Sequence, residues 1–430
     1  MEARPVADVI IIGAGSAGLS AAKALTKVGL TSTVIEGSHR IGGRAYSEEI
    51  APDTWFDLGC SWLVGGATNP FTPIADALGI TLGKEHEDLF RTSGVRWHRN
   101  GALLDPQGQK DCYQFYFDSN VEIGKVVDAG QDISLADVID MEHEYAPPLL
   151  GGISTSWGLD ADGISTVDHW STEGHLGYPV LRGYGNLIKT WGQDVPVTLN
   201  APVTAIDWSG KGVRVETPKG TITGKTLLST VSTGILASNE IRFTPKLPDW
   251  KTEAIHAIPM GCENKVGIHF ERDVFGDARG YYSTWDDEGH FAKVNACPMG
   301  LNLAMVFVGG RLGIWLEKQG PQVFHDYALD RVADIFGNDI RKHVTRSITT
   351  AWHSDPWFRG SWACAMPGQG HQRKNLARAI DERLFFAGEA THIGGQGTCS
   401  GAYLSGVRAA QEITATLSPK QALTSAFAGQ

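Results

Sequence analysis

Three glycines near the start of the chain have a spacing that suits the binding of a dinucleotide. In the segment GAGSAG, Gly13, Gly15 and Gly18 form a G-x-G-x-x-G pattern, and Ser16 lies inside it. The first glycine of such a loop permits a tight turn, the second lets backbone N–H groups approach a pyrophosphate, and the third allows a helix to pack on a strand. An acidic residue about 20 positions further on binds ribose hydroxyls, and Glu36 lies in that window.

The residues around this loop predict the strand, turn, helix and strand of a nucleotide-binding unit. Val9–Ile12 is a continuous β-branched run, which is typical of a parallel strand buried on both faces. Apolar residues recur at helical spacing between positions 19 and 28, and Gly29 marks the expected end of the helix. A second strand is expected over residues 31–36. The opening apolar run is interrupted too early for a secretion signal or a membrane span.

A second glycine-rich stretch, RIGGR, follows the expected second strand. Gly42 and Gly43 would let the backbone pass close to a bound molecule, while Arg40 and Arg44 offer charged donors to phosphate. A basic surface loop is the alternative interpretation. Because the stretch comes directly after the expected ribose-binding residue, we expect it to complete the nucleotide site.

The C-terminal segment RLFFAGEATHIGGQGTCSGAYLSGVRAAQEI predicts a strand at Leu384–Ala387 and a helix over residues 401–413. Together with RIGGR, it resembles the flavin-containing amine oxidase family, which has an R-x-G-G-R motif and a later strand–GE–TH–glycines–GA–helix motif. The resemblance implies that Gly388 and Glu389 bind FAD. The alternative is that Glu389 only caps a helix or lies at the surface.

The resemblance covers most of the chain and identifies it as a soluble, bacterial-type member. FDLGCSWLVG (56–65) looks like the segment on the substrate side of the flavin, and LRGYGNLI (181–188) resembles the family's G-G-Y-G-N-L turn. By the same resemblance Val203 lies near the adenine. The implied fold class is α/β, with a Rossmann-like FAD-binding domain of the amine-oxidase type and a discontinuous α+β substrate-binding domain.

The resemblance also divides the chain into segments. The implied FAD-binding domain comprises residues 1–85, 197–245 and 380–417. The implied substrate-binding domain comprises residues 86–196 and 246–379, and residues 418–430 form a short polar tail. Relatives in this family often dimerise, so a homodimer is a further expectation.

Three residues are expected at the reacting centre. GCENKVGIHF predicts a strand, and Lys265 in it matches the family's lysine that holds a water next to flavin N5. Trp362 falls where one wall of an aromatic cage orients a neutral amine. Thr398 stands where the other wall is usually aromatic, so half of the cage is missing. Ser361 replaces the cysteine that carries covalently bound flavin in some members, which implies non-covalent FAD. The alternatives are a solvated strand lysine and a core tryptophan.

The implied activity is oxidation of an amine C–N bond. A hydride passes from the carbon next to a deprotonated nitrogen to flavin N5, and the imine hydrolyses to an aldehyde or ketone. O2, giving H2O2, or another acceptor reoxidises the flavin. The incomplete cage favours a bulky or aromatic primary or secondary amine. Val64, where polyamine-cleaving relatives can carry an acid, disfavours polyamines. The reaction requires no protein base, and the sequence offers no convincing candidate.

Three other interpretations stay open. A carotenoid-desaturase-like or protoporphyrinogen-oxidase-like enzyme would keep the fold and oxidise other bonds, although Lys265 and the GSW triplet disfavour it. An L-amino-acid oxidase would need an arginine for the substrate carboxylate, and the sequence does not single one out. A flavoprotein without turnover would also keep the glycine motifs.

Composition and charge limit the partners. Acidic residues (48) outnumber basic ones (37), giving a formal net charge of −11, which disfavours nucleic acid as a partner. The histidine and cysteine spacings match no metal motif, so no metal site is expected. Cysteines are expected to be isolated, reduced thiols of a cytoplasmic protein without membrane attachment. They are Cys60, Cys112, Cys262, Cys297, Cys364 and Cys399.

Overall fold

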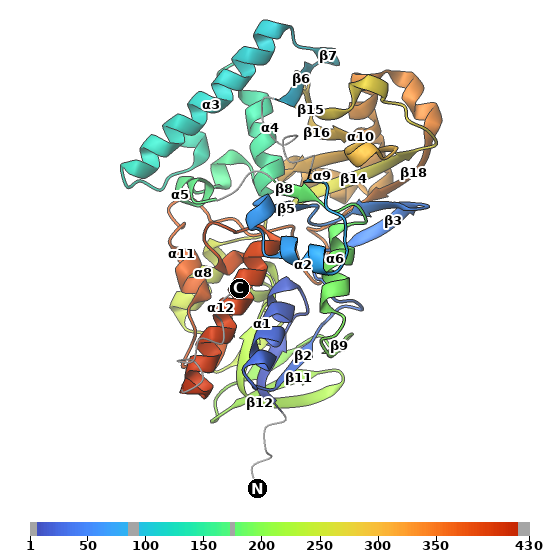
Figure 1. Cartoon of the computed structure of the whole chain (residues 1–430). Helices are drawn as coiled ribbons and strands as arrows, with labels where there is room; N and C mark the ends of the chain where they lie inside the picture. The colour runs from blue at the N-terminus through green and yellow to red at the C-terminus, as the bar shows by residue number, and fades with distance from the viewer. Residues whose placement is uncertain (1–6, 85–93, 173–176, 420–430) are drawn as a thin grey trace.

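The computed structural model describes residues 7–84, 94–172 and 177–419, and these contain two large sheets that lie at opposite ends of the molecule (Figure 1). The first sheet has eight strands in the order β13-β10-β11-β12-β1-β2-β9, with β19 paired to β12. Its strands are β1 (Ala7–Ile12), β2 (Ser32–Ile35), β9 (Val197–Thr198), β10 (Ala205–Asp207), β11 (Val213–Thr217), β12 (Gly220–Ser229), β13 (Arg242–Thr244) and β19 (Leu384–Phe386).

The centre of this sheet is parallel, because β1 pairs in parallel with both β2 and β12. Its residues are apolar on both faces. Val9 and Ile11 pack with helices α1 (Ser16–Lys27) and α12 (Cys399–Leu417), and Ile10 and Ile12 pack with the opposite core. This arrangement confirms the expected strand buried on both faces.

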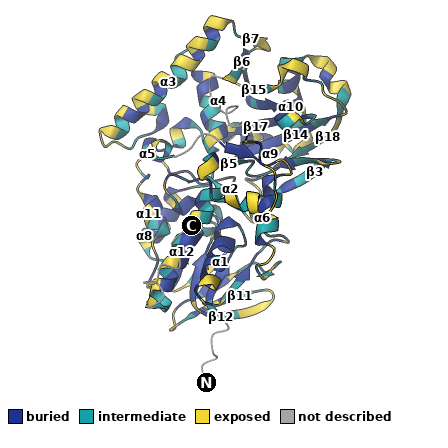
Figure 2. Cartoon of the chain, in the orientation of Figure 1, coloured by how far each residue is buried: buried dark blue, intermediate teal, exposed yellow. Residues whose placement is uncertain are grey.

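Helices α1 and α12 pack closely against each other beside the sheet (Figures 1 and 2). A Cβ at Gly406 would lie 2.1 Å from the Ala17 carbonyl oxygen, so only glycine allows this approach. Two segments almost 400 residues apart in sequence therefore begin their helices side by side.

The second sheet has seven strands in the order β18-β14-β17-β16-β15-β6-β7. All neighbouring strands are antiparallel except β15 and β6. The strands are β6 (Val95–Arg99), β7 (Ala102–Leu103), β14 (Glu263–Phe270), β15 (Gly280–Trp285), β16 (Phe291–Ala296), β17 (Leu303–Gly309) and β18 (Val344–Thr349).

Strand β14 alternates between two environments, as its sequence predicts. Val266, Ile268 and Phe270 enter the core that helix α10 (Pro321–Phe336) covers. Lys265 and Gly267 lie on the other face, where a Cβ at Gly267 would lie 2.8 Å from the Phe56 ring. This second face points toward the first sheet and its helices.

Short elements join the two halves. Strand β5 (Trp62–Val64) pairs with β8 (Gly177–Pro179), and β3 (Ser47–Ala51) pairs with β4 (Thr54–Asp57). The remaining helices are α2 (Phe71–Ala77), α3 (Pro106–Asp128), α4 (Ala146–Trp157), α5 (Thr166–Trp170), α6 (Tyr184–Gly192), α7 (Thr233–Ala237), α8 (Asp249–Ala257), α9 (Gly310–Gln319) and α11 (Gln372–Ala377). Across the described residues, no helix combines the length and apolar character needed to cross a membrane.

Candidate active site

A cavity of about 230 Å³ lies where the first sheet, the N-termini of helices α1 and α12, and strand β14 meet. Most of the residues singled out in the sequence line it: Gly13, Gly15, Ser16, Glu36, Gly42, Gly43, Arg44, Val203, Trp362, Gly388, Glu389 and Thr398. Gly18, Arg40 and Lys265 are not among its lining residues. The structure thus brings together motifs from both ends of the chain.

The two glycine loops form one continuous backbone surface. Gly13 has φ +102°, and the Gly42 N–H donates to the Ala14 carbonyl at 2.9 Å. A Cβ at Gly18 would lie 1.9 Å from the Gly13 carbonyl oxygen, so this glycine sets how closely α1 approaches β1. At Gly15 the nearest atom to a Cβ would be 3.8 Å away, which leaves the backbone there open to the cavity.

The N-terminus of α1 is a suitable anion site. Within the described part of the chain no side chain caps it, its first turn carries no acidic residue, and Ser16 and Ala17 line the cavity. The Ser16 hydroxyl donates to the Cys399 carbonyl at 3.0 Å, which holds the first turns of α1 and α12 together. Two positive helix ends therefore border one cavity.

Glu36 lies at the end of β2 with 7% of its surface exposed. Its carboxylate accepts hydrogen bonds from the backbone N–H groups of Ala14, at 2.8 Å, and Ser38, at 2.9 Å. Each oxygen keeps a further lone pair, so the carboxylate can still accept from ribose hydroxyls.

The two arginines of RIGGR have different surroundings. Arg40 donates to the Gly43 carbonyl at 2.7 Å and stacks 3.8 Å from the Tyr46 ring centre, and burial holds its pKa below the usual value. Arg44 faces the cavity and pairs with Glu389 at 2.9 Å. Arg40 thus supports the loop from behind, whereas Arg44 is placed to meet a ligand.

Glu389 is a buried carboxylate that accepts hydrogen bonds from several segments, and it does not lie at the surface. Beyond the Arg44 pair, its oxygens accept from the backbone N–H groups of Ala363, at 3.1 Å, and Gly397, at 2.9 Å. One carboxylate therefore ties the RIGGR loop to the Trp362 segment and to the loop before α12.

Two of the cysteines expected to be isolated are in fact neighbours. Cys60 and Cys399 both line the cavity, and their thiols are hydrogen-bonded to each other. This contact raises the pKa of Cys60 and lowers that of Cys399. The expectation of isolated thiols was wrong for this pair, because the fold joins segments that sequence spacing separates. All six cysteines are free.

Lys265 is buried, with 3% of its surface exposed, and so is not a solvated strand lysine. Its ammonium donates to the Gly59 carbonyl and to the Ser61 hydroxyl, at 2.8 Å in the second case. Gly59 lines the cavity, whereas Ser61 lines a second cavity of about 280 Å³. Among the described residues these are its two acceptors, so one of the three ammonium N–H groups is left for another acceptor.

Trp362 and Thr398 lie on the same side of the cavity. A Cβ at Gly397 would lie 3.6 Å from the Trp362 ring, so glycine keeps this wall flat. Thr398 is the N-cap of α12, where its hydroxyl accepts from the Gly401 N–H at 2.9 Å and donates to the Gly395 carbonyl. The Thr398 hydroxyl is therefore engaged by the helix end.

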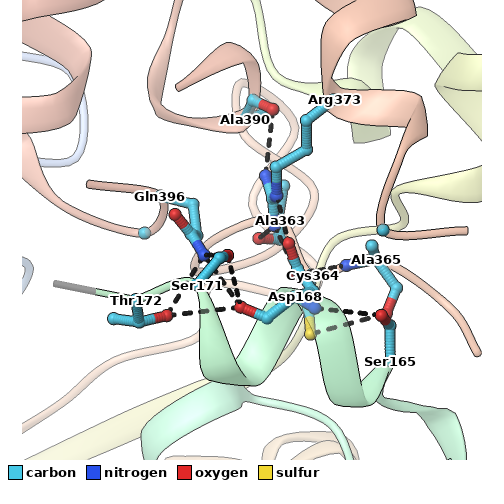
Figure 3. Close-up of polar contacts among 12 residues, drawn as sticks. Ser165, Asp168, Ser171, Thr172, Ala363, Cys364, Ala365, Arg373, Ala390 and Gln396 are labelled. Carbon is cyan, nitrogen blue, oxygen red and sulfur yellow. Dashed lines mark hydrogen bonds and ion pairs between the residues drawn. The ribbon is translucent and has the colours of Figure 1, made fainter. Parts of the chain in front are cut away.

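A buried ion pair, which the sequence did not suggest, holds the Trp362 segment in place (Figure 3). Arg373 and Asp168 are each 1% exposed and make a two-pronged contact, one prong of which measures 2.7 Å. Arg373 also donates to the carbonyls of Ala363 and Ala390, both at 2.9 Å, and Asp168 accepts from the Ala365 N–H at 2.8 Å. The hydrogen bond and charge of Asp168 overcome the effect of burial and raise the pKa of Arg373.

The described residues contain no group of three or more His, Cys, Asp or Glu side chains that could hold a metal ion.

Comparison with known proteins decides the family. Residues 16–111 and 116–414 match the profile described as flavin containing amine oxidoreductase. The chain belongs to the flavin-containing amine oxidoreductase family. It is 30% identical to polyamine oxidase 4 of Oryza sativa subsp. japonica, over 94% of this chain and 88% of that protein. It is also 30% identical to polyamine oxidase 2 of Arabidopsis thaliana, over 94% and 87% of the two chains.

A solved structure shows the same fold. A double mutant of putrescine oxidase with redesigned cofactor binding superposes with a TM-score of 0.76 at 18% identity, covering 95% of this chain and 99% of that one. The family, the fold class, FAD as cofactor and amine oxidation, all expected from the sequence, are thereby confirmed. This protein is an FAD-dependent amine oxidase.

The cavity has the features that FAD needs. Its glycine loops and the uncapped N-terminus of α1 suit a pyrophosphate, the buried Glu36 carboxylate suits ribose hydroxyls, and Arg44 adds a positive charge.

Proposed function

We propose that this amine oxidase acts on bulky or aromatic primary or secondary amines. The support is the shape of the reacting wall, because Thr398 is small and its hydroxyl is occupied in capping α12, so no second aromatic ring stands beside Trp362 there. Beyond Lys265, the second cavity offers apolar and aromatic surface from Trp55, Trp62, Tyr281, Leu303 and Met305. A bulky amine could extend from the first cavity toward this second one.

Polyamines are the second candidate. The curated relatives at 30% identity are polyamine oxidases. The second cavity also contains Asp57, whose pKa burial raises to about 6, despite a hydrogen bond from Ser47. A carboxylate at this position suits a second ammonium group.

We propose that FAD is held non-covalently. The pyrophosphate would lie at Gly13, Gly15, Ser16 and Arg44, with Glu36 at the ribose and Val203 at the adenine. The flavin end would lie near Gly43, Gly388 and Glu389, with Gly18 and Arg40 supporting the loops from behind. FAD, when bound, supplies the acceptor for the two electrons of the amine C–H bond.

The chain's own side chains orient the amine. Trp362 offers a flat π surface that attracts a cation as it approaches and then holds the neutral amine in place. Lys265 has one N–H left after binding Gly59 and Ser61, and we propose that it holds a water at the reacting side. The Arg373–Asp168 pair acts indirectly, by fixing the backbone on which Trp362 stands.

We further propose the domain division expected above, with the FAD-binding domain formed by residues 1–85, 197–245 and 380–417. The strands of the first sheet all begin and end inside these segments. O2 as acceptor, a homodimer and a cytoplasmic location complete the proposal.

Anaerobic mixing of the holoenzyme with a panel of amines tests the substrate class. The panel contains benzylamine, N-methylbenzylamine, spermine and L-phenylalanine, and the visible flavin absorbance is followed. We expect benzylamine or its N-methyl derivative to bleach the flavin fastest. Fastest bleaching by spermine would favour the polyamine alternative. Bleaching by L-phenylalanine alone would favour an amino-acid oxidase, and bleaching by dithionite alone would overturn the proposal.

Lys265→Met tests the role of the lysine. We expect slower reoxidation by O2, slower flavin reduction, or both, with FAD content unchanged. Lys110→Met, on the exposed side of α3, is the matched control and should react as the wild type does. Identical kinetics in both variants would contradict a role for Lys265 at the reacting centre.

A further inference from the structure

Glu263 is a buried carboxylate without a hydrogen-bond donor. It is the first residue of β14, is 3% exposed and lines the same cavity as Trp362. Its backbone N–H donates to the Ser361 hydroxyl at 2.8 Å, which fixes the residue beside the Trp362 segment. No group in the described residues donates a hydrogen bond to its side chain. Buried carboxylates are usually paired, so an open one facing a cavity suggests a ligand with positive charge or N–H donors.

Two lysines share the face of the sheet on which Glu263 lies. Lys265 is two residues along the same strand, and Lys293 on β16 reaches the same face through the register that aligns Lys293, Phe307 and Lys265. Both ammonium groups bind elsewhere, because Lys293 donates to the Gly152 carbonyl and the Ser156 hydroxyl, each at 3.0 Å. The two lysines therefore create a positive potential at Glu263 without donating a hydrogen bond to its carboxylate.

Burial and this potential act in opposite directions on Glu263. Burial raises its pKa to about 7, while the charges of Lys265 and Lys293 limit the increase. Burial in turn lowers the pKa of Lys293 to about 8, despite the charge of Glu263. The other charged groups at this end of the cavity are the Arg44–Glu389 pair, and Asp57 lies beyond Lys265. A carboxylate with a pKa close to neutrality can both accept and release a proton under ordinary conditions.

Amines reach the enzyme mostly as ammonium ions, whereas oxidation requires a lone pair on nitrogen. We propose that Glu263 receives the ammonium group of the substrate beside Trp362 and accepts one of its protons. This inference rests on the proposed amine oxidation at this site. In the step, the N–H bond breaks and its electron pair stays on nitrogen. The proton forms an O–H bond with the carboxylate, so R–NH3⁺ and Glu–COO⁻ become R–NH2 and Glu–COOH.

The sequence analysis found no base because nothing local marks this glutamate. The triplet ENK sits in an ordinary strand pattern, and Glu263 becomes unusual only when Ser361, Lys293 and the cavity surround it. A glutamate that merely balanced the two lysines would be expected to bind one of them directly, and neither ammonium donates to it.

Stopped-flow reduction of the flavin by benzylamine, under anaerobic conditions between about pH 6 and about pH 9, tests the proposal. In the wild type, the second-order rate constant of reduction should rise with pH, and the midpoint of this rising limb of the pH–rate profile should lie near pH 7. In Glu263→Gln it should fall about 100-fold near neutrality, the order of magnitude that a positioned base contributes. The rate should recover at high pH, where the free amine binds already deprotonated. If the wild type responds only to another amine of the panel, that amine replaces benzylamine.

Three controls separate the outcomes. Glu263→Asp keeps a carboxylate and should restore part of the rate and the limb, whereas Glu288→Gln, at an exposed position, should match the wild type. FAD content and the visible spectrum report whether each variant folds. A limb and rate unchanged in Glu263→Gln would overturn the inference and leave amine oxidation standing. A wild type whose flavin no amine of the panel reduces would overturn both.

Discussion

Two groups of buried charges border the segment that carries Trp362, and they differ in how completely their charges are paired. The Asp168 and Arg373 side chains satisfy each other and three backbone groups around them, those of Ala363, Ala365 and Ala390 (Figure 3). Glu263, on the other side of the same segment, has two lysines nearby and a hydrogen bond from neither. One group is closed, and the other is open to a cavity.

The difference separates structure from function. A closed buried pair contributes specificity and costs much to break, because removing one partner leaves an unpaired charge. An open buried carboxylate costs free energy in the folded state, and such a cost persists where a ligand uses the group. The closed pair fixes Trp362, and the open carboxylate meets what Trp362 orients.

The largest effect is expected from breaking the closed pair. Arg373→Met leaves Asp168 buried and unpaired, which should lower the free energy of unfolding by about 3–5 kcal/mol. Urea unfolding at equal FAD occupancy measures this loss. Arg311→Met is the matched control, because Arg311 pairs with Asp160 and Asp162 at the surface and should contribute about 1 kcal/mol at most. Equal losses in the two variants would contradict the large cost assigned to breaking the buried, closed pair.

The open carboxylate of Glu263 should also make the free energy of unfolding depend on pH. The pKa of Glu263 rises from 4.5 to about 7 on folding, so its favourable contribution is complete below about pH 4.5 and is lost as the pH rises through about 7. Glu263→Gln lacks this loss. Its stability relative to the wild type should therefore increase by up to about 3 kcal/mol across that interval. A pH-independent difference in the free energy of unfolding would show that Glu263 is already paired.

Glu389 lies between these extremes, because it is well bonded and also lines the cofactor cavity. Glu389→Gln removes the negative charge that pairs with Arg44 and one of the two acceptor oxygens. This change should lower the free energy of unfolding by about 1–3 kcal/mol. Because the affected loops form the cavity, we expect FAD to bind about 10-fold more weakly. Quenching of FAD fluorescence on titration into the apoprotein measures the affinity. Unchanged FAD affinity would place Glu389 outside the cofactor site.

The smallest effect is expected at Lys293. Lys293→Met removes a positive charge that favours the ionised form of Glu263, so the limb of the amine-reduction profile should move to higher pH by less than about one unit. The same kinetic experiment reports the shift. A shift to lower pH would contradict the assignment of that limb to Glu263.

The same contrast explains what the sequence could predict. The cofactor cradle depends on backbone geometry, so Gly13, Gly18 and Gly42 mark it in short contiguous motifs that can be recognised before folding. The strand around Lys265 could also be predicted, because its apolar residues alternate within one short segment. Arg373 with Asp168, and Glu263 with Lys293, are side-chain meetings across distant segments, and no local pattern encodes them. The contact of Cys60 with Cys399 was missed because the separation of two residues in sequence does not give their distance in the folded protein.

Infrared difference spectroscopy of the holoenzyme between about pH 5 and about pH 9 tests most directly whether Glu263 is the open carboxylate. The wild type should show a protonated carboxyl signal that disappears with a midpoint near pH 7. Glu263→Gln should remove this signal, and Glu288→Gln should keep it. A wild type without such a signal, or a signal that survives in Glu263→Gln, would contradict the account.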